Sequence, residues 1–253
     1  MSEKPLRFDP AELDRAAREG AEESLPVLVL RQAAAELMVA GLKRLRFRTE
    51  RNPDAGRAYD GMSVPEFEAV NARQRWANWR TIPRNLDGRL PDAPVRALDL
   101  CCGTGRSTQV LAWCLPAGSE ILGLELCPRL GRAAAERDYR RRDGAPARVR
   151  VRVQSVLETF RGADGAALPD ASAGLVNSSG ALGLHFDDRA LGRVADEIRR
   201  VLKPGGLATI DTGGRGAAFE RLAVVFGARG FELLGSARSC ALDRYPQACF
   251  LRP

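Results

Sequence analysis

The sequence predicts an α/β fold, in which a mostly parallel sheet follows a helical N-terminal extension. After about residue 90, short apolar segments alternate with amphipathic segments, as in strands joined by crossover helices. Before that point the periodic segments have helical spacing only. At 253 residues and 45% hydrophobic content, the chain is long enough for one α/β domain with an extension. We therefore divide it into a helical cap, residues 1–90, and an α/β domain, residues 91–253.

The N-terminal extension is expected to contain three helices. Residues 11–23 and 25–45 have apolar side chains at helical spacing, and residues 52–61 have the composition of a loop. Ser63, followed by a proline and an early acid, marks the start of a third helix that runs to about Arg80. Residues 81–85, which include a proline, are expected to end it.

A strand, a glycine turn and a helix follow the extension. Residues 95–100 are largely apolar, as expected for a strand buried on both faces of a parallel sheet. Gly103 and Gly105 allow the backbone to turn sharply and to approach a ligand closely. Ser107 and Thr108 offer N-cap chemistry to the next helix. This arrangement is typical of sites that hold a nucleotide-like cofactor.

A second strand, residues 121–124, ends in Glu125, where a carboxylate would meet the hydroxyls of a ribose. Two classes of protein use this geometry. Gly103, Gly105 and Thr108 loosely fit the G-x-G-x-x-G/A spacing of dinucleotide-binding oxidoreductases. However, neither Tyr139 nor Tyr245 is followed by a lysine four residues later, as in short-chain dehydrogenases.

From about Asp92 to its end, the chain resembles the class I S-adenosylmethionine-dependent methyltransferases. Their first motif, D-x-G-x-G-x-G, stands here as D-L-C-C-G-T-G from Asp99 to Gly105, with Cys101 at the first glycine position. The quinone-biosynthesis branch of this family has a small residue such as Ala or Cys there. A second family motif, L-K-P-G-G, is residues 202–206. The resemblance favours a methyltransferase over an oxidoreductase.

The resemblance implies a Rossmann-like sheet of seven mostly parallel strands in the order 3-2-1-4-5-7-6, with the last strand antiparallel. Residues 174–179 and 207–211 would be the fourth and fifth strands, and residues 231–234 and 248–251 the final pair. In residues 148–153 arginine alternates with valine, which is typical of a strand with one wet face. That pattern agrees with the edge position of the third strand.

The implied cofactor is S-adenosyl-L-methionine, with S-adenosyl-L-homocysteine as product. By resemblance, Asp99 and the glycine turn lie against its methionine end and ribose, and Glu125 takes the ribose hydroxyls. Leu126 would pack on the adenine, and Gln154 and Ser155 stand where the family often has an acid for the adenine amino group. The expected cofactor-binding residues are therefore Asp99, Cys101, Gly103, Gly105, Glu125, Leu126, Gln154, Ser155, Asn177, Arg73 and Trp76.

The last two of these residues belong to the helical cap. Arg73 or Arg80 would pair with the cofactor carboxylate. Trp76 or Trp79 would cover the cofactor, because an aromatic face attracts a sulfonium. The alternative, favoured for each tryptophan taken alone, is that it seals a helix onto the domain.

His185, the only histidine, follows the fourth strand, where the acceptor pocket of this family opens. It is either a general base for an acceptor that must lose a proton or a packing residue. Residues 177–180 replace the Asn/Asp-Pro-Pro-Tyr motif of exocyclic amine methylation, and no Pro-Cys nucleophile or paired-glutamate hairpin is present. We therefore expect a small-molecule acceptor. A nucleic-acid methyltransferase and a non-catalytic cofactor-binding scaffold remain alternatives.

The net charge of +7 raises the possibility of a nucleic-acid partner. The densest basic run, residues 43–48, is flanked by acids, which favours a solvated helix end over a phosphate track. Arginine far outnumbers lysine, as in GC-rich bacterial genomes. No apolar run reaches membrane-spanning length and no signal-peptide core is present, so we expect a cytoplasmic protein with no membrane contact. The sequence leaves the oligomeric state open.

The six cysteines form no C-x-x-C pair, and with a single histidine they predict no metal site. We expect reduced thiols. Cys101 and Cys102 adjoin the predicted cofactor turn, so they form either a redox-sensitive site or, the favoured interpretation, small buried side chains.

Overall fold

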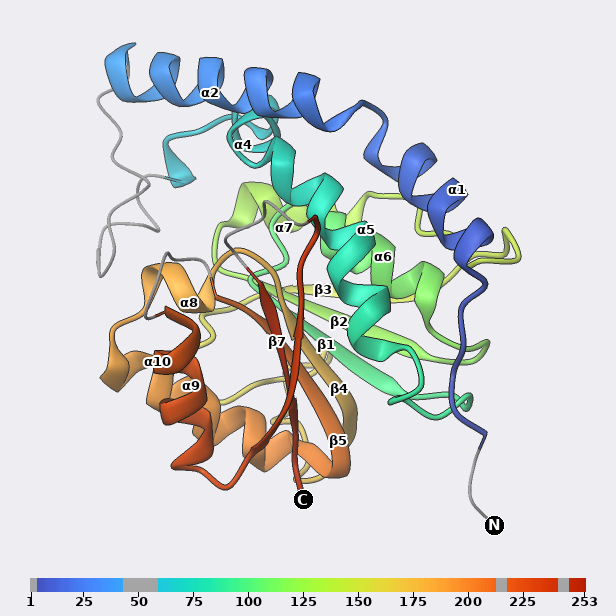
Figure 1. Ribbon diagram of the computed structural model, residues 1–253. Coiled ribbons are helices and arrows are strands. Elements are labelled where there is room, and N and C mark those ends of the chain that lie inside the picture. Colours follow the sequence, from blue (N-terminus) through green and yellow to red (C-terminus); the bar gives the residue numbers. More distant parts are fainter. Residues whose placement is uncertain (1–3, 43–58, 213–217, 241–245) are drawn as a thin grey trace.

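The computed structural model, which describes residues 4–42, 59–212, 218–240 and 246–253, contains one seven-stranded sheet in the order β3-β2-β1-β4-β5-β7-β6 (Figure 1). Strand β7 runs antiparallel to β5 and β6, and the remaining neighbours pair in parallel. The predicted strand order and the antiparallel last strand are thus confirmed. The strands are β1 Arg96–Leu100, β2 Glu120–Glu125, β3 Arg148–Val153, β4 Ala173–Ser178, β5 Leu202–Asp211, β6 Glu232–Ala237 and β7 Gln247–Leu251.

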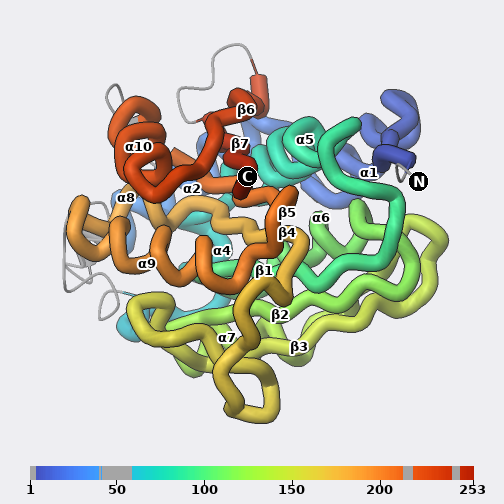
Figure 2. The backbone as a smooth tube through the Cα atoms, turned by 90° about the horizontal axis from the view of Figure 1, so that it is seen from below, coloured from blue at the N-terminus to red at the C-terminus, as the bar shows by residue number. Residues whose placement is uncertain are grey.

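Helices cover both faces of the sheet (Figure 2). Helices α9 and α10 pack on one face, and α5 and α6 pack on the other. The helices of the α/β part are α6 Arg106–Cys114, α7 Pro128–Ala135, α8 Leu182–His185, α9 Asp188–Val201 and α10 Ala218–Gly227. Those of the extension are α1 Pro10–Ala21, α2 Leu25–Leu42, α4 Val64–Val70 and α5 Ala72–Leu86. None of the described helices is long and apolar enough to cross a bilayer.

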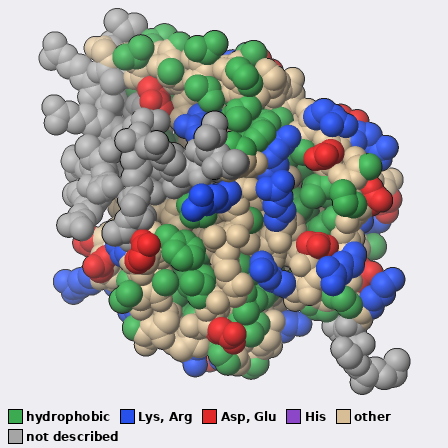
Figure 3. Space-filling model, in the orientation of Figure 1, with side chains coloured by type: hydrophobic (Ala, Val, Ile, Leu, Met, Phe, Trp, Pro, Cys, Tyr) green, Lys and Arg blue, Asp and Glu red, His purple; other side chains and the backbone are tan. Residues whose placement is uncertain are grey.

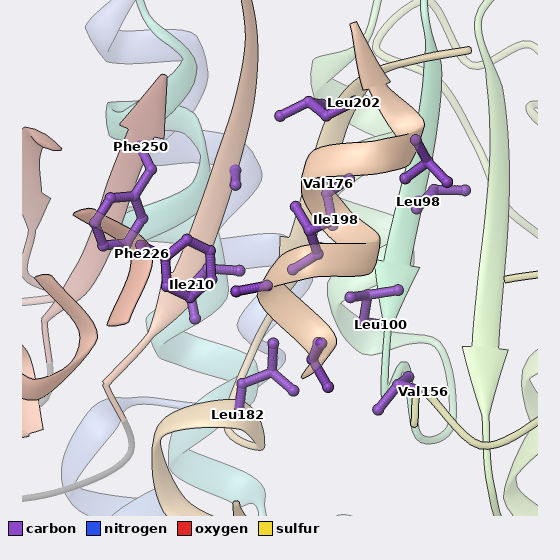
Figure 4. Close-up of a cluster of buried hydrophobic side chains, with 14 of the residues drawn as sticks. Leu98, Leu100, Val156, Val176, Leu182, Ile198, Leu202, Ile210, Phe226 and Phe250 are labelled. Atoms are coloured by element: carbon purple, nitrogen blue, oxygen red, sulfur yellow. The ribbon is translucent and has the colours of Figure 1, made fainter. Parts of the chain in front are cut away.

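The core has one large cluster on each face of the sheet. On one face, strand residues such as Val176 and Ile210 pack against Ile198 of α9 and Phe226 of α10 (Figure 4). On the other, α5 contributes Trp79, Ile82 and Leu86 to a cluster that includes strand and α6 side chains. The extension therefore shares a core with the sheet, and the boundary after residue 90 stays a prediction.

The prediction of one continuous third helix that ends near Arg80 was wrong in two respects. It is broken at Asn71, whose side-chain amide donates to the Phe67 carbonyl at 2.9 Å. It then continues through Pro83 to Leu86, because this stretch buries Ile82 and Leu86 completely against the sheet. The run at 43–48, residues 43–45 of the second predicted helix and most of the loop at 52–61 lie outside the described residues.

Of two further predicted segments, residues 202–206 differ from the prediction and strand β3 agrees with it. Residues 202–206, expected as a turn, are the first part of β5, where Gly205 has a φ of +75° and donates its N–H to Arg252 O at 2.7 Å. A register shift in the β4–β5 pairing accommodates this glycine pair. The arginine–valine alternation does belong to an edge strand, β3, in which Arg148 and Arg150 are exposed.

Candidate functional site

The glycine turn between β1 and α6 is shaped by close contacts. Cys101, Gly103 and Gly105 have φ angles of 56°, 57° and 84°, a region that favours glycine. A Cβ on Gly103 would lie 2.8 Å from the Phe67 ring, and one on Gly105 would lie 2.0 Å from the Tyr139 hydroxyl. Both glycines are thus required by space as well as by backbone conformation.

Asp99, at the end of β1, is fully buried and holds the turn from behind. Its carboxylate accepts hydrogen bonds from Ser107 Oγ at 2.7 Å, Thr108 Oγ1 at 2.6 Å and Asn177 Nδ2 at 2.7 Å. Burial nevertheless raises the pKa of Asp99. The expected N-cap role of the two hydroxyls was wrong: Gly105 is the N-cap of α6 and makes no side-chain cap.

Glu125, at the end of β2, meets the same turn. Its carboxylate accepts the Gly103 N–H and the Cys127 N–H, both at 2.8 Å. The residue is 7% exposed, and burial raises its pKa although these backbone donors oppose the shift. The acid of the second strand and the glycine turn of the first, which were paired on sequence spacing, are therefore in direct contact.

A cavity of about 430 Å³ lies beside this contact, at the carboxyl ends of β1, β2, β3 and β4. Its floor comes from the sheet domain, and Tyr59, Phe67 and Asn71 of the extension contribute to its wall. Six residues named from the sequence line it: Cys101, Glu125, Leu126, Gln154, Ser155 and His185.

The other predicted site residues do not line this cavity. Asp99, Gly103, Gly105 and Asn177 build the turn and its support. Trp76 lines a second cavity on the far side of α5, together with Arg80. Arg73 lines neither cavity, and its backbone N–H donates to Gln32 Oε1 at 3.1 Å.

The polar groups of Gln154 and Ser155 are engaged in the loop that follows β3. Gln154 Nε2 donates to Thr159 O at 2.6 Å, and its Oε1 accepts the Arg161 N–H at 3.2 Å. Ser155 Oγ accepts the Leu157 N–H at 3.2 Å. These two residues therefore shape the cavity wall with bonds made inside the protein.

His185 contacts a residue that sequence reasoning missed. A hydrogen bond of 2.9 Å joins its Nε2 to the hydroxyl of Tyr59, and the two rings meet edge to face at 5.6 Å. Burial lowers the pKa of His185 to about 4, so the imidazole is neutral at pH 7. Its Nδ1 is buried with no hydrogen-bond partner in the described part of the chain.

An acid on α4 ties the extension to the glycine turn. Glu68 accepts from the Thr104 hydroxyl, from Arg106 Nε at 2.7 Å and from Arg137 at 3.4 Å. Thr104 belongs to the turn itself, and Arg106 begins α6. One carboxylate thus binds three groups of the sheet domain.

Glu22, at the end of α1, reinforces this contact. It accepts from Arg106 at 2.6 Å and from the buried Arg75 of α5. We call Glu22 and Glu68 the acidic clamp. No single stretch of sequence signals it, because its partners come from three separate segments, at residues 75, 104–106 and 137.

The cysteines are all free thiols. Cys102 is a small buried side chain, as the favoured interpretation expected, whereas Cys101 is half-buried and lines the cavity. Desolvation raises the pKa of both thiols, which disfavours the reactive thiolate. Within the described ranges, no group of three or more His, Cys, Asp or Glu side chains is placed to hold a metal ion.

Residues 97–206 match a family model described as a methyltransferase domain. Among solved structures, the chain is similar to a TehB-like SAM-dependent methyltransferase from Corynebacterium glutamicum, with 20% identity over 80% of this chain and 100% of that one and a TM-score of 0.51. It is also similar to a chain of the Haloferax volcanii complex that contains the Trm112 methyltransferase activator, with 16% identity, coverage of 70% and 90%, and a TM-score of 0.52. No curated protein matches the chain in sequence.

The matched residues include the glycine turn, Glu125 and the start of β5. The description of this model agrees with the methyltransferase resemblance and not with the oxidoreductase alternative. At these identities, the solved structures establish the fold.

Proposed function

We propose that this chain is a class I S-adenosylmethionine-dependent methyltransferase that transfers the methyl group to a small-molecule acceptor. The observation that carries this proposal is the cavity of about 430 Å³, which the helical extension partly covers. Its volume lies in the lower part of the range of roughly 300–1,000 Å³ that is typical of small-molecule sites. Tyr59 and Phe67 of the extension form part of its wall.

The residues present fit the cofactor. Glu125 offers carboxylate oxygens to the ribose hydroxyls at a position where its other contacts are backbone N–H groups. Leu126 lines the cavity and is 55% exposed, which leaves an apolar surface for the adenine ring. Cys101, at the first glycine position, takes the left-handed backbone that a glycine would take there. When bound, S-adenosylmethionine supplies an activated methyl group on a sulfonium.

Positioning would supply most of the catalysis, since the methyl group is already activated. For an acceptor that must lose a proton, His185 is the candidate base, and its pKa of about 4 makes it a weak one at pH 7. The tautomer with hydrogen on Nε2 donates to the Tyr59 oxygen and leaves the Nδ1 lone pair free to accept a proton. Tyr59 is then a positioning residue, because it holds the ring in one orientation. For an acceptor that is already nucleophilic, both residues would only line the pocket.

Two measurements test the proposal. Calorimetry with S-adenosylhomocysteine and with NAD(P) should show binding of the first only; tight NAD(P) binding without S-adenosylhomocysteine binding would contradict the cofactor assignment. A labelled methyl donor should then transfer its label to a component of a pooled metabolite extract. Repeated absence of transfer, with cofactor binding established, would favour the non-catalytic scaffold.

A further inference from the structure

The second cavity, of about 700 Å³, lies between α5 and the end of β6 and shares no lining residue with the first. Four arginines line it: Arg80 and Arg84 on α5, Arg89 just after α5, and Arg238 just after β6. Trp76, Arg80 and Arg84 are spaced four residues apart, so they lie on one face of the helix. Figure 3 shows basic side chains gathered on the face of the molecule where Figure 1 places α5.

These four arginines form no ion pair with the acids of the described ranges. Among the residues that the structure describes, no aspartate or glutamate lines the cavity and none of the four guanidinium groups forms an ion pair. Arg84 donates to the Arg238 carbonyl at 2.7 Å, and Arg89 donates to the Asn85 carbonyl at 3.4 Å. The guanidinium groups of Arg80, Arg84 and Arg89 thus donate to neutral carbonyl groups, and the charge of Asp14 acts on Arg80 without forming an ion pair with it.

Elsewhere the chain pairs arginines with carboxylates at short distances. Arg106 reaches Glu22 at 2.6 Å, Arg200 reaches Glu197 at 2.6 Å, and Arg229 reaches Asp196 at 2.8 Å. At the second cavity, by contrast with these three pairs, four arginines without an ion pair to a described residue lie around one hollow. Four like charges around one hollow repel one another, and an anionic ligand would relieve that repulsion.

Two neighbouring side chains make the cavity more than a charged surface. Arg80 stacks on Trp76, with its Cζ 3.8 Å from the ring centroid, which fixes the direction of one guanidinium. Asn85 is fully buried at the cavity wall, and its Oδ1 has no hydrogen-bond partner among the described residues. The Nδ2 group of Asn85 already donates to Gln247. The oxygen is therefore the part of this amide that lacks a partner and can still accept a hydrogen bond.

We propose that this second cavity binds a small phosphate ester that carries a hydroxyl group. One guanidinium group can donate two parallel hydrogen bonds to the oxygens of a phosphate. The unpartnered Asn85 oxygen could accept a hydrogen bond from a ligand hydroxyl. The volume of about 700 Å³ exceeds what a lone phosphate ion fills. This inference stands apart from the methyl-transfer proposal, because it uses other residues and another cavity.

The test uses the full chain, with glycerol 3-phosphate, inorganic phosphate and glycerol as calorimetric probes at low salt. We expect saturable binding of glycerol 3-phosphate, weaker binding of inorganic phosphate and none of glycerol. The triple variant Arg84→Gln, Arg89→Gln, Arg238→Gln should lower the affinity at least tenfold. All three side chains are exposed, so the fold should survive, and unchanged S-adenosylhomocysteine binding would verify this.

A matched control removes the same charge at the other edge of the sheet, with Arg132→Gln, Arg148→Gln and Arg150→Gln, all exposed. It should leave phosphate-ester affinity unchanged; equal losses in both triples would reduce the effect to net charge and overturn the proposal. Absence of saturable binding would overturn it too. Equal affinity for inorganic phosphate would assign the cavity to the free ion instead. A single-stranded oligonucleotide that binds more tightly, through the same arginines, would make it a nucleic-acid surface.

Discussion

Tyr59 and His185 lie 126 positions apart in the sequence, and a hydrogen bond of 2.9 Å joins the Tyr59 hydroxyl to His185 Nε2. Tyr59 belongs to the helical extension, whereas His185 ends the short helix α8 after β4. Because both residues line the first cavity, the extension contributes directly to the candidate site.

The buried histidine should make stability depend on pH. Its pKa is about 4 in the folded chain and about 6.5 when unfolded, so below pH 6.5 only the unfolded state gains the proton. The histidine's contribution is therefore complete above pH 6.5 and falls as the pH drops toward 4, by about 3 kcal/mol in total. Denaturant unfolding of the wild type and His185→Gln at pH 7 and pH 4.5 isolates this term, because the carboxylates are common to both. Equal pH slopes in the two proteins would contradict it.

If His185 is the base, both His185→Ala and His185→Gln should lower kcat by about 10²–10⁴-fold with S-adenosylhomocysteine affinity nearly unchanged. Tyr59→Phe keeps the ring and removes the hydrogen bond, so we expect a smaller loss of kcat. Steady-state kinetics on the acceptor found in the metabolite screen measures these effects. Recovery of activity in the Gln variant alone would mean that the histidine only packs.

Glu125→Gln should weaken S-adenosylhomocysteine binding by about 1–3 kcal/mol, because a charge-assisted acceptor is lost where the ribose is expected. Glu120→Gln is the matched control, since it changes the same residue type at the other, exposed end of β2. Calorimetry should find the control unchanged. Equal affinities for all three proteins would remove Glu125 from the cofactor site.

Glu68→Ala should lower the free energy of unfolding by about 1–3 kcal/mol, since Thr104, Arg106 and Arg137 all lose a partner. The comparison is Asp196→Asn, which removes the carboxylate that pairs with Arg229 at a side chain that is 62% exposed. That change should have little effect, because exposed ion pairs contribute little. Urea unfolding distinguishes the two, and comparable losses would mean that the acidic clamp is no stronger than a surface pair.

Cys101→Gly should raise stability by about 0.5–1 kcal/mol, because glycine adopts a φ of 56° without strain while gaining some freedom in the unfolded chain. Ala171→Gly, at a φ of 51° far from the cavity, should shift stability in the same direction. Thermal unfolding of both variants measures the effect. A destabilised Cys101→Gly beside a stabilised Ala171→Gly would show that the thiol packing outweighs the backbone strain.

The sheet was predictable from sequence because its signals are local and ordered along the chain. The glycine turn after Asp99 and the glycine pair at 205–206 mark two particular strands, and the arginine alternation marks an edge. Glu125 was found for the same reason, because its spacing from the glycine turn can be read directly from the sequence.

The remaining features depend on contacts that no local pattern encodes. Pro83 usually ends a helix, but burial of Ile82 and Leu86 outweighed that preference. The hydroxyls of Ser107 and Thr108 favour a helix cap, but the buried Asp99 needed donors more. The role of Tyr59 could not be predicted, because it depends on a hydrogen bond to His185, which is distant in the sequence.

The acidic clamp should couple cofactor binding at the glycine turn to the stability with which the N-terminal helices are attached to the sheet domain. Glu68 holds Thr104 in the turn that a cofactor would contact, so a ligand that orders the turn also strengthens the hold on α4. Thermodynamic linkage makes this coupling reciprocal. If the ligand strengthens the attachment of α4 by a given factor, then loss of that attachment lowers the affinity for the ligand by the same factor. Saturation with S-adenosylhomocysteine should accordingly slow amide hydrogen exchange in α4, and the slowing should disappear in Glu68→Ala. Under this coupling, α4 responds to the ligand through the acidic clamp as well as through Phe67, which lines the cavity.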